Sequence, residues 1–500
     1  MGGSPKKRMT ETLRQRGGCP NRRDFLKTCA ALAAGAAVEP AAALTFGKTA
    51  SAAPALPSWT GESAVSDVFV VNNIPAPTCS LASGVLPGTG ACSTAQMAFR
   101  DAGVETLINL MRTRGTPFYR TADHPAGVVP ADAVVILKIN NQWGGCGSGT
   151  GYGRLSTNTD LLKGVIWKIL QHPDGFSGEV VVADNAQPIS SNQWGAIPAN
   201  AEDQNQTYDA VVQAFVSQGH PVSLADWTAL NANLIDAGAI DAAGYAGEYA
   251  SGDVSDGYVI LGEPAGSGAV GPRRLSYPKF QTQAGNRISL RHGLWNGAAY
   301  DADRVRLINF PVLKKHCMAG CTAAWKNLVG FISCAEEASR FGGWDEMHGF
   351  FWDYVPVTPA SYGLLGRQMG AVRNPDLHIL DAIWVATQDN FSSDAAVRLN
   401  ALLASRDPFA LDWYASEYLL RPLIADNPWD VSAARGGIFR TATRINQKAA
   451  QSAFGSGYSF IDLDAGYDGS TPSEAEKNQM NVHVVSSVTG LPAVNGLLLE

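Results

Sequence analysis

Hydrophobic and polar positions follow two periods in turn along most of the chain after residue 53. Short apolar runs at Val68–Val71, Ala133–Asn140 and Gly178–Asn185 predict buried strands. Apolar residues recur with helical spacing at Ala95–Met111 and Thr159–Leu170. A strand, a helix and another strand in this order predict a parallel pair joined by a right-handed crossover. We therefore expect an α/β fold with a mainly parallel sheet and flanking helices.

The same alternation continues in the second half of the chain. Apolar runs at Arg304–Leu313 and Leu377–Ala386 predict strands, and the run at Arg398–Ser405 predicts a further short element. Helices are expected at Ala319–Ile332 and at Pro408–Leu420, where an Asp-Pro pair is typical of a helix start.

Residues 187–266 differ from the rest in composition. They are rich in Asn, Ala, Gly and Asp, and their periodicity is weak apart from one helix near Tyr208–Val216. We expect residues 53–186 to form a first α/β half, 187–266 an acidic insertion and 267–500 a second α/β half. The whole is long enough for one bilobed unit or for two domains.

The amino-terminal segment resembles an export signal. Asn21–Lys27 contains a twin-arginine pair, an Ala-rich stretch follows it, and Ala50–Ala52 supplies the small residues that signal peptidase requires. Glu39 and Pro40 interrupt the apolar stretch, which argues against a membrane anchor. We expect residues 1–52 to be a twin-arginine signal peptide that is removed, with the mature protein periplasmic or extracellular and the twin-arginine translocase as its partner during export.

Removal of this segment changes the net charge. The full chain has 38 Lys and Arg and 45 Asp and Glu residues. Residues 1–52 contain nine of the basic and three of the acidic residues, so the remainder carries 29 basic and 42 acidic side chains, a net charge of −13. A surface of this sign repels nucleic acid and anionic lipid. No stretch after residue 52 is as long and apolar as a membrane-spanning helix, so no stable membrane insertion is expected.

Two cysteines have the spacing of a disulfide in an oxidising compartment. Cys79 and Cys92 flank a loop rich in Pro, Gly and Ser, and we expect them to pair.

A glycine-rich loop follows the strand Ala133–Asn140. The sequence WGGCGSGTGYG, which includes Gly147 and Gly149, lies between a strand and a helix start. In that position backbone N–H groups can surround an anion. The loop matches neither the P-loop nor the dinucleotide fingerprint, and a plain surface loop is the alternative.

Polar residues end the two first-half strands. Lys138 and Asn140 lie at the end of one strand and Asp184 at the end of the next. Ligands of open α/β sheets bind at the carboxyl ends of strands. Lys138 is therefore expected to pair with a carboxylate such as Asp184, to face a pocket, or both.

The segment NFPVLKKHCMAGCTAAWKNLVG, in the second half of the chain, contains several charged and reactive side chains close together. Lys314, His316, Thr322 and Lys326 are expected to form a polar cluster at a helix start, able to hold a carboxylate or phosphate with His316 as acid or base. The alternative is a solvated helix start without a ligand. Cys321 falls on the apolar stripe of the expected helix, which favours a buried core residue.

The same cysteine also permits a metal hypothesis. Cys317 and Cys321, completed by Cys334, Cys146 or His316, would suit an iron–sulfur cluster or zinc. No standard four-cysteine spacing is present, which argues against such a site.

Several of these motifs together resemble the uncharacterised family called domain of unknown function 362. VVILKIN followed by a loop, a helix and VVVADN is similar to its first half, and the Lys-x-His segment, DLHILDAIWV and LLASRDPFALDWYA are similar to its second. The resemblance implies functional roles for a set of polar residues, namely Lys138, Asn140, Asp184, Lys314, His316, Thr322, Lys326, Asn327, Asp381, Asp407 and Asp412. Family members are in some cases fused to iron–sulfur modules, which implies redox partners, but this chain has no such module.

The chain departs from the family pattern at Cys317 and Cys321 and after the LDAIWV strand, where Thr387–Asn390 replaces a glycine-rich turn. These departures leave open whether a family cofactor is retained.

The leading hypothesis is an exported enzyme of redox or isomerase type acting on a small anionic substrate. Its catalytic set is His316, Lys314, Lys326 and Asp184, and its substrate-binding set is Lys138, Asn140, Gly147, Gly149, Thr322, Asn327, Asp381, Asp407 and Asp412. The alternatives are an iron–sulfur or other metal-binding redox protein that uses Cys317 and Cys321, and a periplasmic binding protein without turnover.

Overall fold

A computed structural model gives the fold for most of the chain after residue 55. It describes residues 56–75, 101–141, 155–185, 194–195, 199–202, 205–236, 255–261, 275–316, 319–333, 363–387, 396–424 and 438–487. The expected signal peptide, the glycine-rich loop and the expected disulfide lie outside the described residues.

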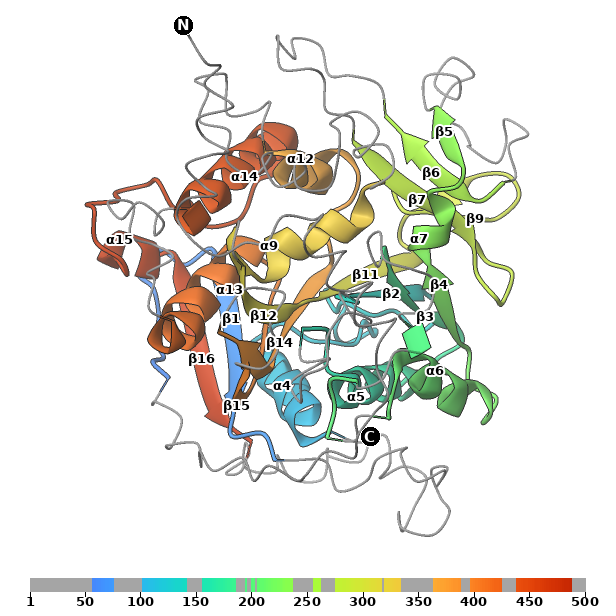
Figure 1. The fold of residues 1–500 in the computed structure, drawn as a ribbon, viewed down its shortest axis with the longest axis horizontal. Helices are drawn as coiled ribbons and strands as arrows, with labels where there is room; N and C mark the ends of the chain where they lie inside the picture. Colours follow the sequence, from blue (N-terminus) through green and yellow to red (C-terminus); the bar gives the residue numbers. More distant parts are fainter. Residues whose placement is uncertain are drawn as a thin grey trace, which may run out of the picture.

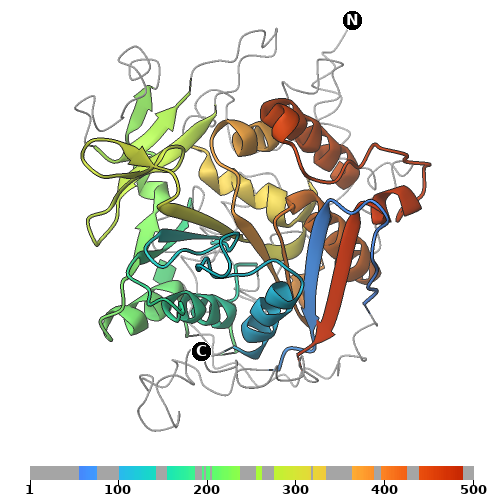
Figure 2. The ribbon, with the colours of Figure 1, turned by 180° about the vertical axis from the view of Figure 1, so that it is seen from behind.

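The centre of the molecule is a ten-stranded sheet (Figure 1). Its order is β16 (Met480–Ser486), β1 (Ser66–Asn72), β15 (Ala396–Ser405), β14 (Leu377–Ala386), β11 (Val305–Phe310), β2 (Val134–Ile139), β3 (Glu179–Asp184) and β4 (Val222–Asp226). Beside this path, β12 (Val312–His316) pairs with β14, and β13 (Gly320–Thr322) pairs with β12. Strands β1 and β16, far apart in sequence, lie side by side at one edge (Figure 2).

The sheet is mainly parallel, as the sequence predicts. Strands β4, β3, β2, β11, β14 and β12 run in one direction. Among the described strands of this sheet, only β15 and β13 run in the opposite direction: β15 is antiparallel to β1 and β14, and β13 is antiparallel to β12. The β2–β3 pair is joined through helix α5 (Thr159–Leu170), which is the crossover predicted from the sequence.

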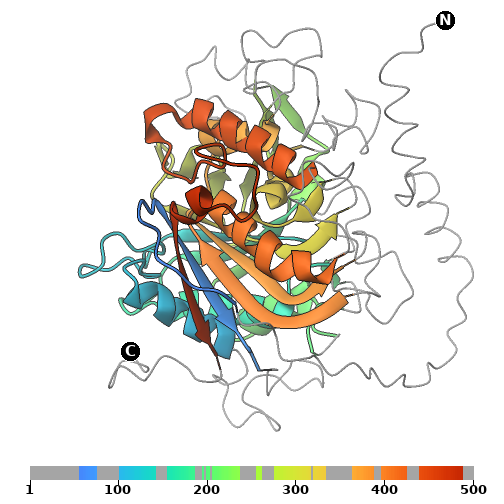
Figure 3. The ribbon, with the colours of Figure 1, turned by 90° about the vertical axis from the view of Figure 1, so that its left-hand side faces the viewer.

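Helices cover both faces of this sheet, so its strands are apolar on both sides. Successive residues of β2 show this: Val134 and Ile136 belong to one core, and Val135 and Leu137 to the other. Helices α4 (Ala102–Thr113), α5 and α6 (Tyr208–Val216) pack on one face. Helices α9 (Ala324–Asn327), α12 (Leu364–Ala371), α13 (Pro408–Tyr414) and α14 (Ile438–Phe454) pack on the other (Figure 3).

A second, six-stranded sheet adjoins the face that carries α9 (Figure 1). Its order is β10 (Tyr300–Asp301), β9 (Gly293–Trp295), β8 (Arg287–Ser289), β7 (Ser276–Gln281), β6 (Gly257–Ile260) and β5 (Leu234–Asp236). Trp227, in the short helix α7 (Trp227–Leu230), contacts Phe280 of this sheet and Phe331 after α9, with ring centroids 5.9 and 6.0 Å away. These aromatic contacts attach the second sheet to the main body.

The stretch 187–266 takes part in both sheets. Its predicted helix is present as α6 at Tyr208–Val216. The following strand, β4, extends the main sheet beside β3, and β5 and β6 belong to the second sheet.

The segment predicted as a helix at Ala319–Ile332 is different in the structure. It forms strand β13, then the single-turn helix α9, then a 3-10 turn at Leu328–Phe331. Gly320 has a φ of +73°, which glycine adopts easily and which suits the reversal from β12 to β13. The helix predicted at Pro408–Leu420 is present as α13 followed by a π-helical stretch at Ala415–Leu420, with Asp407 as its N-cap.

Within the described residues, no helix has both the length and the apolar character needed to cross a membrane.

Candidate functional site

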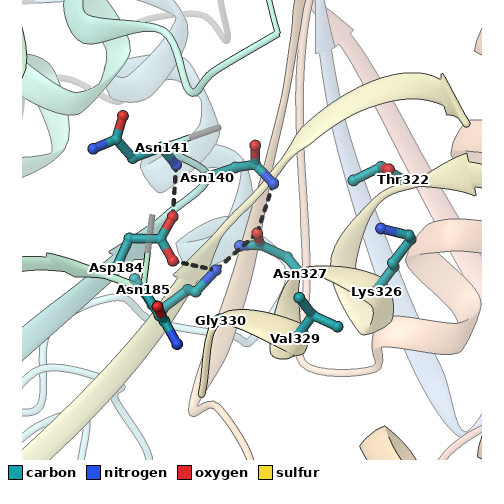
Figure 4. Close-up of a pocket in the computed structure, with 10 residues that line it drawn as sticks. Asn140, Asn141, Asp184, Asn185, Thr322, Lys326, Asn327, Val329 and Gly330 are labelled. Carbon is teal, nitrogen blue, oxygen red and sulfur yellow. Dashed lines mark hydrogen bonds and ion pairs between the residues drawn. The ribbon is translucent and has the colours of Figure 1, made fainter. Parts of the chain in front are cut away.

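A polar pocket lies between the ends of β2 and β3 and the residues of α9 and the turn after it (Figure 4). Its empty space, including the part open to solvent, is about 310 Å³. The lining residues are Lys138, Asn140, Asn141, Asp184, Asn185, Thr322, Lys326, Asn327, Val329 and Gly330. Residues predicted from both halves of the chain therefore meet in one site, at the carboxyl ends of parallel strands.

Helix α9 owes its position to a carboxylate from another helix. Its N-cap residue, Ala323, has no side-chain acceptor for the first N–H groups of the helix. Asp412 of α13 accepts instead from the N–H of Ala324 at 2.6 Å and of Trp325 at 3.0 Å. Because two bonds fix the start of α9, Lys326 is held toward the pocket.

A buried ion pair forms one wall of the pocket. Nζ of Lys138 lies 2.8 Å from Oδ1 of Asp184, and the two side chains are 2 % and 5 % exposed. Oδ2 of Asp184 accepts from the backbone N–H of Asn141 at 2.6 Å. Burial raises the pKa of Asp184, while Lys138 and the backbone donors oppose the rise. The pairing predicted for Lys138 is thus present, and the same lysine faces a pocket.

Asn327 connects this ion pair to the rest of the site. Its Oδ1 accepts from Nζ of Lys138 and from Nδ2 of Asn140, both at 2.9 Å. Its Nδ2 donates to Oδ1 of Asn309 at 2.8 Å, and Nδ2 of Asn309 bonds to Nδ1 of His378 at 2.9 Å. Burial lowers the pKa of His378 to about 3, which keeps this histidine neutral as an acceptor. The network therefore fixes the side chains of Lys138 and Asn140 in place.

Two further lysines lie at the pocket. Nζ of Lys314 is fully buried behind Asn140 and donates to its Oδ1 at 3.1 Å and to the carbonyl of Leu155 at 2.6 Å. Burial lowers the pKa of Lys314 well below its ordinary value, and Lys326 and Lys138 add to the effect. Burial likewise lowers the pKa of Lys326 to about 7, with Lys138 contributing and Cys321 opposing. Lys326 can therefore gain or lose a proton near neutral pH.

The hydroxyl of Thr322 is the clearest unused donor in the lining. Its Oγ1 is buried and makes no hydrogen bond to any group in the described part of the protein. A buried polar atom without a partner is costly unless a ligand or water satisfies it.

Gly330 lines the pocket and lies directly against the ion pair of Lys138 and Asp184. A Cβ at this position would lie less than 3.0 Å from Nζ of Lys138 and from Oδ1 of Asp184. Only glycine fits here without displacing one of the two charged groups.

A family match covers the pocket residues that come from the second half of the chain. Residues 257–417 match the family described as domain of unknown function (DUF362). The chain carries a DUF362 domain. The match includes Thr322, Lys326 and Asn327, and it confirms the resemblance of the second half of the chain. The first-half segments, which contain Lys138 and Asp184, lie outside the match. Neither the curated proteins nor the solved structures yielded a match.

His316, expected as the acid or base, and Cys321, expected in the core or as a metal ligand, do not line the pocket. His316 is on β12, where its Nδ1 accepts from the N–H of Ala319 at 3.1 Å. Cys321 is buried on β13, in the core as predicted, although on a strand rather than on a helix. Burial, with Asp412 adding to it, raises the pKa of the Cys321 thiol well above its ordinary value.

This environment does not suit a metal ligand, because a cysteine binds metal as the thiolate. Within the described ranges, no three His, Cys, Asp or Glu side chains lie close enough to hold a metal ion. Of the other candidate metal ligands, Cys146, Cys317 and Cys334 lie outside the described residues.

Three aspartates were expected to bind the substrate, but none of them lines the pocket. Each one accepts hydrogen bonds from other groups of the protein. Asp381 accepts from the N–H of Asn158, before α5, and of Ile383. Asp407 caps α13 and accepts from Oγ of Ser66. Asp412 positions α9 as described above. Gly147 and Gly149 belong to the loop outside the described residues, while Asn141 and Leu155, on either side of it, are at the site.

No motif in the sequence assigns a role to four residues of the site, namely Asn141, Asn185, Asn309 and Gly330. Asn141 directly follows one predicted strand and Asn185 is the last residue of another, and this position is a signal that the sequence contains. The role of Gly330 depends on contacts with residues far away in the sequence.

Proposed function

We propose that this protein is an exported enzyme that binds a small organic anion in the pocket between β2, β3 and α9. The observation that carries the proposal is the convergence of Lys138, Lys326 and the unbonded Thr322 hydroxyl on one buried cavity. Donors of this kind at the carboxyl ends of parallel strands suit a carboxylate or a phosphate.

The balance of charge supports an anionic ligand. Among the described lining residues, Lys138 and Lys326 are basic and Asp184 is the one acid, with Lys314 directly behind. Burying several ammonium groups together is unfavourable, and the lowered pKa of Lys326 reflects this cost. An anion in the cavity would favour the charged form of Lys326 and add hydrogen bonds to it.

The reaction class that fits best is proton transfer of the isomerase type. Because the anion favours the ammonium form, abstraction would run in the fraction of complexes in which Lys326 is neutral, a form that its pKa of about 7 keeps accessible. In that form Lys326 would take a proton from a carbon next to the bound anionic group, and it would then return the proton as an ammonium ion. His316 was the expected acid or base, but it lies outside the lining. We therefore propose Lys326 for this role, with Lys138 and Thr322 binding the anionic group.

Ligand discovery by thermal unfolding tests the proposal. The protein would be heated with a panel of monocarboxylates, dicarboxylates and phosphate monoesters, since a ligand that binds the folded state raises the unfolding midpoint. At least one anion should stabilise the wild type and give a smaller shift with Lys326→Gln. A panel without any effect on the wild type would contradict the proposal.

Turnover is tested on the ligands found. Each is incubated with the protein in deuterated water, and proton NMR follows exchange of the carbon-bound hydrogen. Exchange by the wild type but not by Lys326→Gln supports an enzyme. Binding without exchange would make the protein a periplasmic binding protein instead.

A further inference from the structure

A second cavity lies at the opposite end of the main sheet, where β11 and β14 begin and β15 ends. Its empty space, including the part open to solvent, is about 890 Å³. The residues that characterise its lining are Arg120, Arg306, Arg406, Asp376, Phe454 and Phe460. They come from the loop before β2, the starts of β11 and β14, the end of β15, the last residue of α14 and the segment after it.

Guanidinium groups outnumber carboxylates in this cavity. Arg306 is paired on both sides, with Asp376 at 3.0 Å and Asp303 at 2.9 Å. Arg120 reaches Asp303 only at 3.9 Å. Arg406 donates to the carbonyl of Ala126 at 2.6 Å and has no carboxylate partner within the described part of the chain. The cavity is therefore positive on a protein with a net negative charge.

The neighbouring cations affect the pKa of Arg406. Burial lowers its pKa, Asp376 opposes the effect, and Arg120 and Arg306 add to it. Nε of Arg306 is also buried and makes no hydrogen bond to the described residues. An oxoanion between these groups would offset the repulsion between the guanidinium ions and accept hydrogen bonds from their N–H groups. The planar guanidinium matches the geometry of a carboxylate or a phosphate.

The other wall of the cavity is aromatic. The rings of Phe454 and Phe460 meet edge to face with centroids 5.7 Å apart. Phe460 is held from behind by Phe409 of α13, at 6.1 Å. This wall offers apolar contact beside the arginines, which a bare inorganic ion could not use.

We propose that this cavity is a second ligand site, for a small organic anion whose carboxylate, sulfonate or phosphate is attached to an apolar group. Arg406 and Arg120 bind the anionic group, and Phe454 and Phe460 contact the apolar part. The site is independent of the function proposed above, because none of its lining residues lines the first pocket.

Phenyl phosphate is the probe, because it combines both features, and calorimetric titration measures its affinity. We expect it to bind the wild type, and to bind Arg406→Gln about tenfold or more weakly, in keeping with loss of a charged hydrogen-bond donor. Phe460→Ala should weaken phenyl phosphate while leaving inorganic phosphate unchanged. Lys326→Gln is the matched control from the first pocket: it removes any binding of phenyl phosphate there and should keep the binding that Arg406→Gln weakens.

The side chain of Arg406 is at the surface, so Arg406→Gln is expected to fold, and its unfolding midpoint verifies this. Absence of binding to the wild type would overturn the proposal. So would an affinity that is unchanged in Arg406→Gln, or one that is lost in Lys326→Gln alone, because the ligand would then occupy the first pocket.

Discussion

Lys326 lines the first pocket with a pKa of about 7, lowered by burial, so its charge changes within the physiological range. Lys138 is different because its ion pair with Asp184 favours the charged form. One lysine of the pocket is therefore suited to holding charge and the other to exchanging a proton.

The pKa of Lys326 makes anion binding dependent on pH. An anion binds the ammonium form, which is lost as the pH rises through about 7. Affinity should fall about tenfold between pH 6 and pH 8, following the fraction of charged amine. Calorimetric titrations at several pH values measure this. In Lys326→Gln, affinity should be weaker and nearly constant over the same range; an equally steep fall in that variant would assign the proton to another group.

Gly330 provides a second test at the level of one residue. In Gly330→Ala the new Cβ would displace Lys138 or Asp184, so the free energy of unfolding should fall by about 1–3 kcal/mol, as for overpacked cores. Urea unfolding measures the change. The matched control is Gly457→Ala, where a Cβ would meet no atom within 4 Å. Equal stability of the two variants would show that the ion pair tolerates the methyl group.

At the level of elements, Asp412 links α13 to α9. Burial raises its pKa to about 8, although the N–H groups of Ala324 and Trp325 oppose the rise. In Asp412→Ala both N–H groups lose their acceptor, and the free energy of unfolding should fall by about 1–3 kcal/mol or more. Anion affinity should fall as well, because α9 carries Lys326 and Asn327.

Urea unfolding and anion titration of Asp412→Ala test this together. Asp468→Ala is the control, since Asp468 is exposed and bonds only to Ser470 within the described residues. Its unfolding midpoint and anion affinity should match the wild type. A fully stable Asp412→Ala with unchanged affinity would refute the positioning role.

The same helix shows what local sequence can and cannot predict. Strands β2 and β3 and helix α5 were predicted closely, because apolar periodicity and the cap at Asn158 are local signals. The start of α9 was placed too early, since Cys321, Trp325 and Leu328 share helical spacing. Its cap comes from Asp412, 88 residues beyond Ala324, so no local signal marks the boundary.

For the site, too, local signals in the sequence could be used and contacts between distant residues could not. Lys138, Asn140 and Asp184 could be placed because they end predicted parallel strands, which meet at one edge. The resemblance to the family supplied Thr322, Lys326 and Asn327. It also suggested Asp381, Asp407 and Asp412 as ligands, whereas the structure shows them bonded to backbone N–H groups.

At the level of the whole molecule, the two cavities lie at opposite ends of the main sheet. The first is built from the carboxyl ends of β2 and β3 and is small and buried, with lysines and amides. The second is wider and combines arginines with aromatic rings. This difference in chemistry suits two different ligands.

Export is also a property of the whole chain. If residues 1–52 direct folded protein through the twin-arginine route, Arg22→Lys together with Arg23→Lys should keep the precursor in the cytoplasm. Cell fractionation and the mass of the exported form measure this, with cleavage expected before Ala53. Lys6→Arg together with Lys7→Arg, which leaves the twin-arginine pair intact, is the control. Normal export of the Arg22, Arg23 variant would contradict the proposed route.

The binding site is tested by calorimetric titration of the best anion from the thermal panel, at pH 6.5, into wild type, Lys326→Gln and Arg406→Gln. If the pocket between β2, β3 and α9 binds the anion, Lys326→Gln should lose at least about tenfold in affinity, the loss expected of a charged hydrogen-bond donor. Arg406→Gln should bind as the wild type does. Equal affinity in the wild type and Lys326→Gln would show that the anion does not bind in the pocket between β2, β3 and α9.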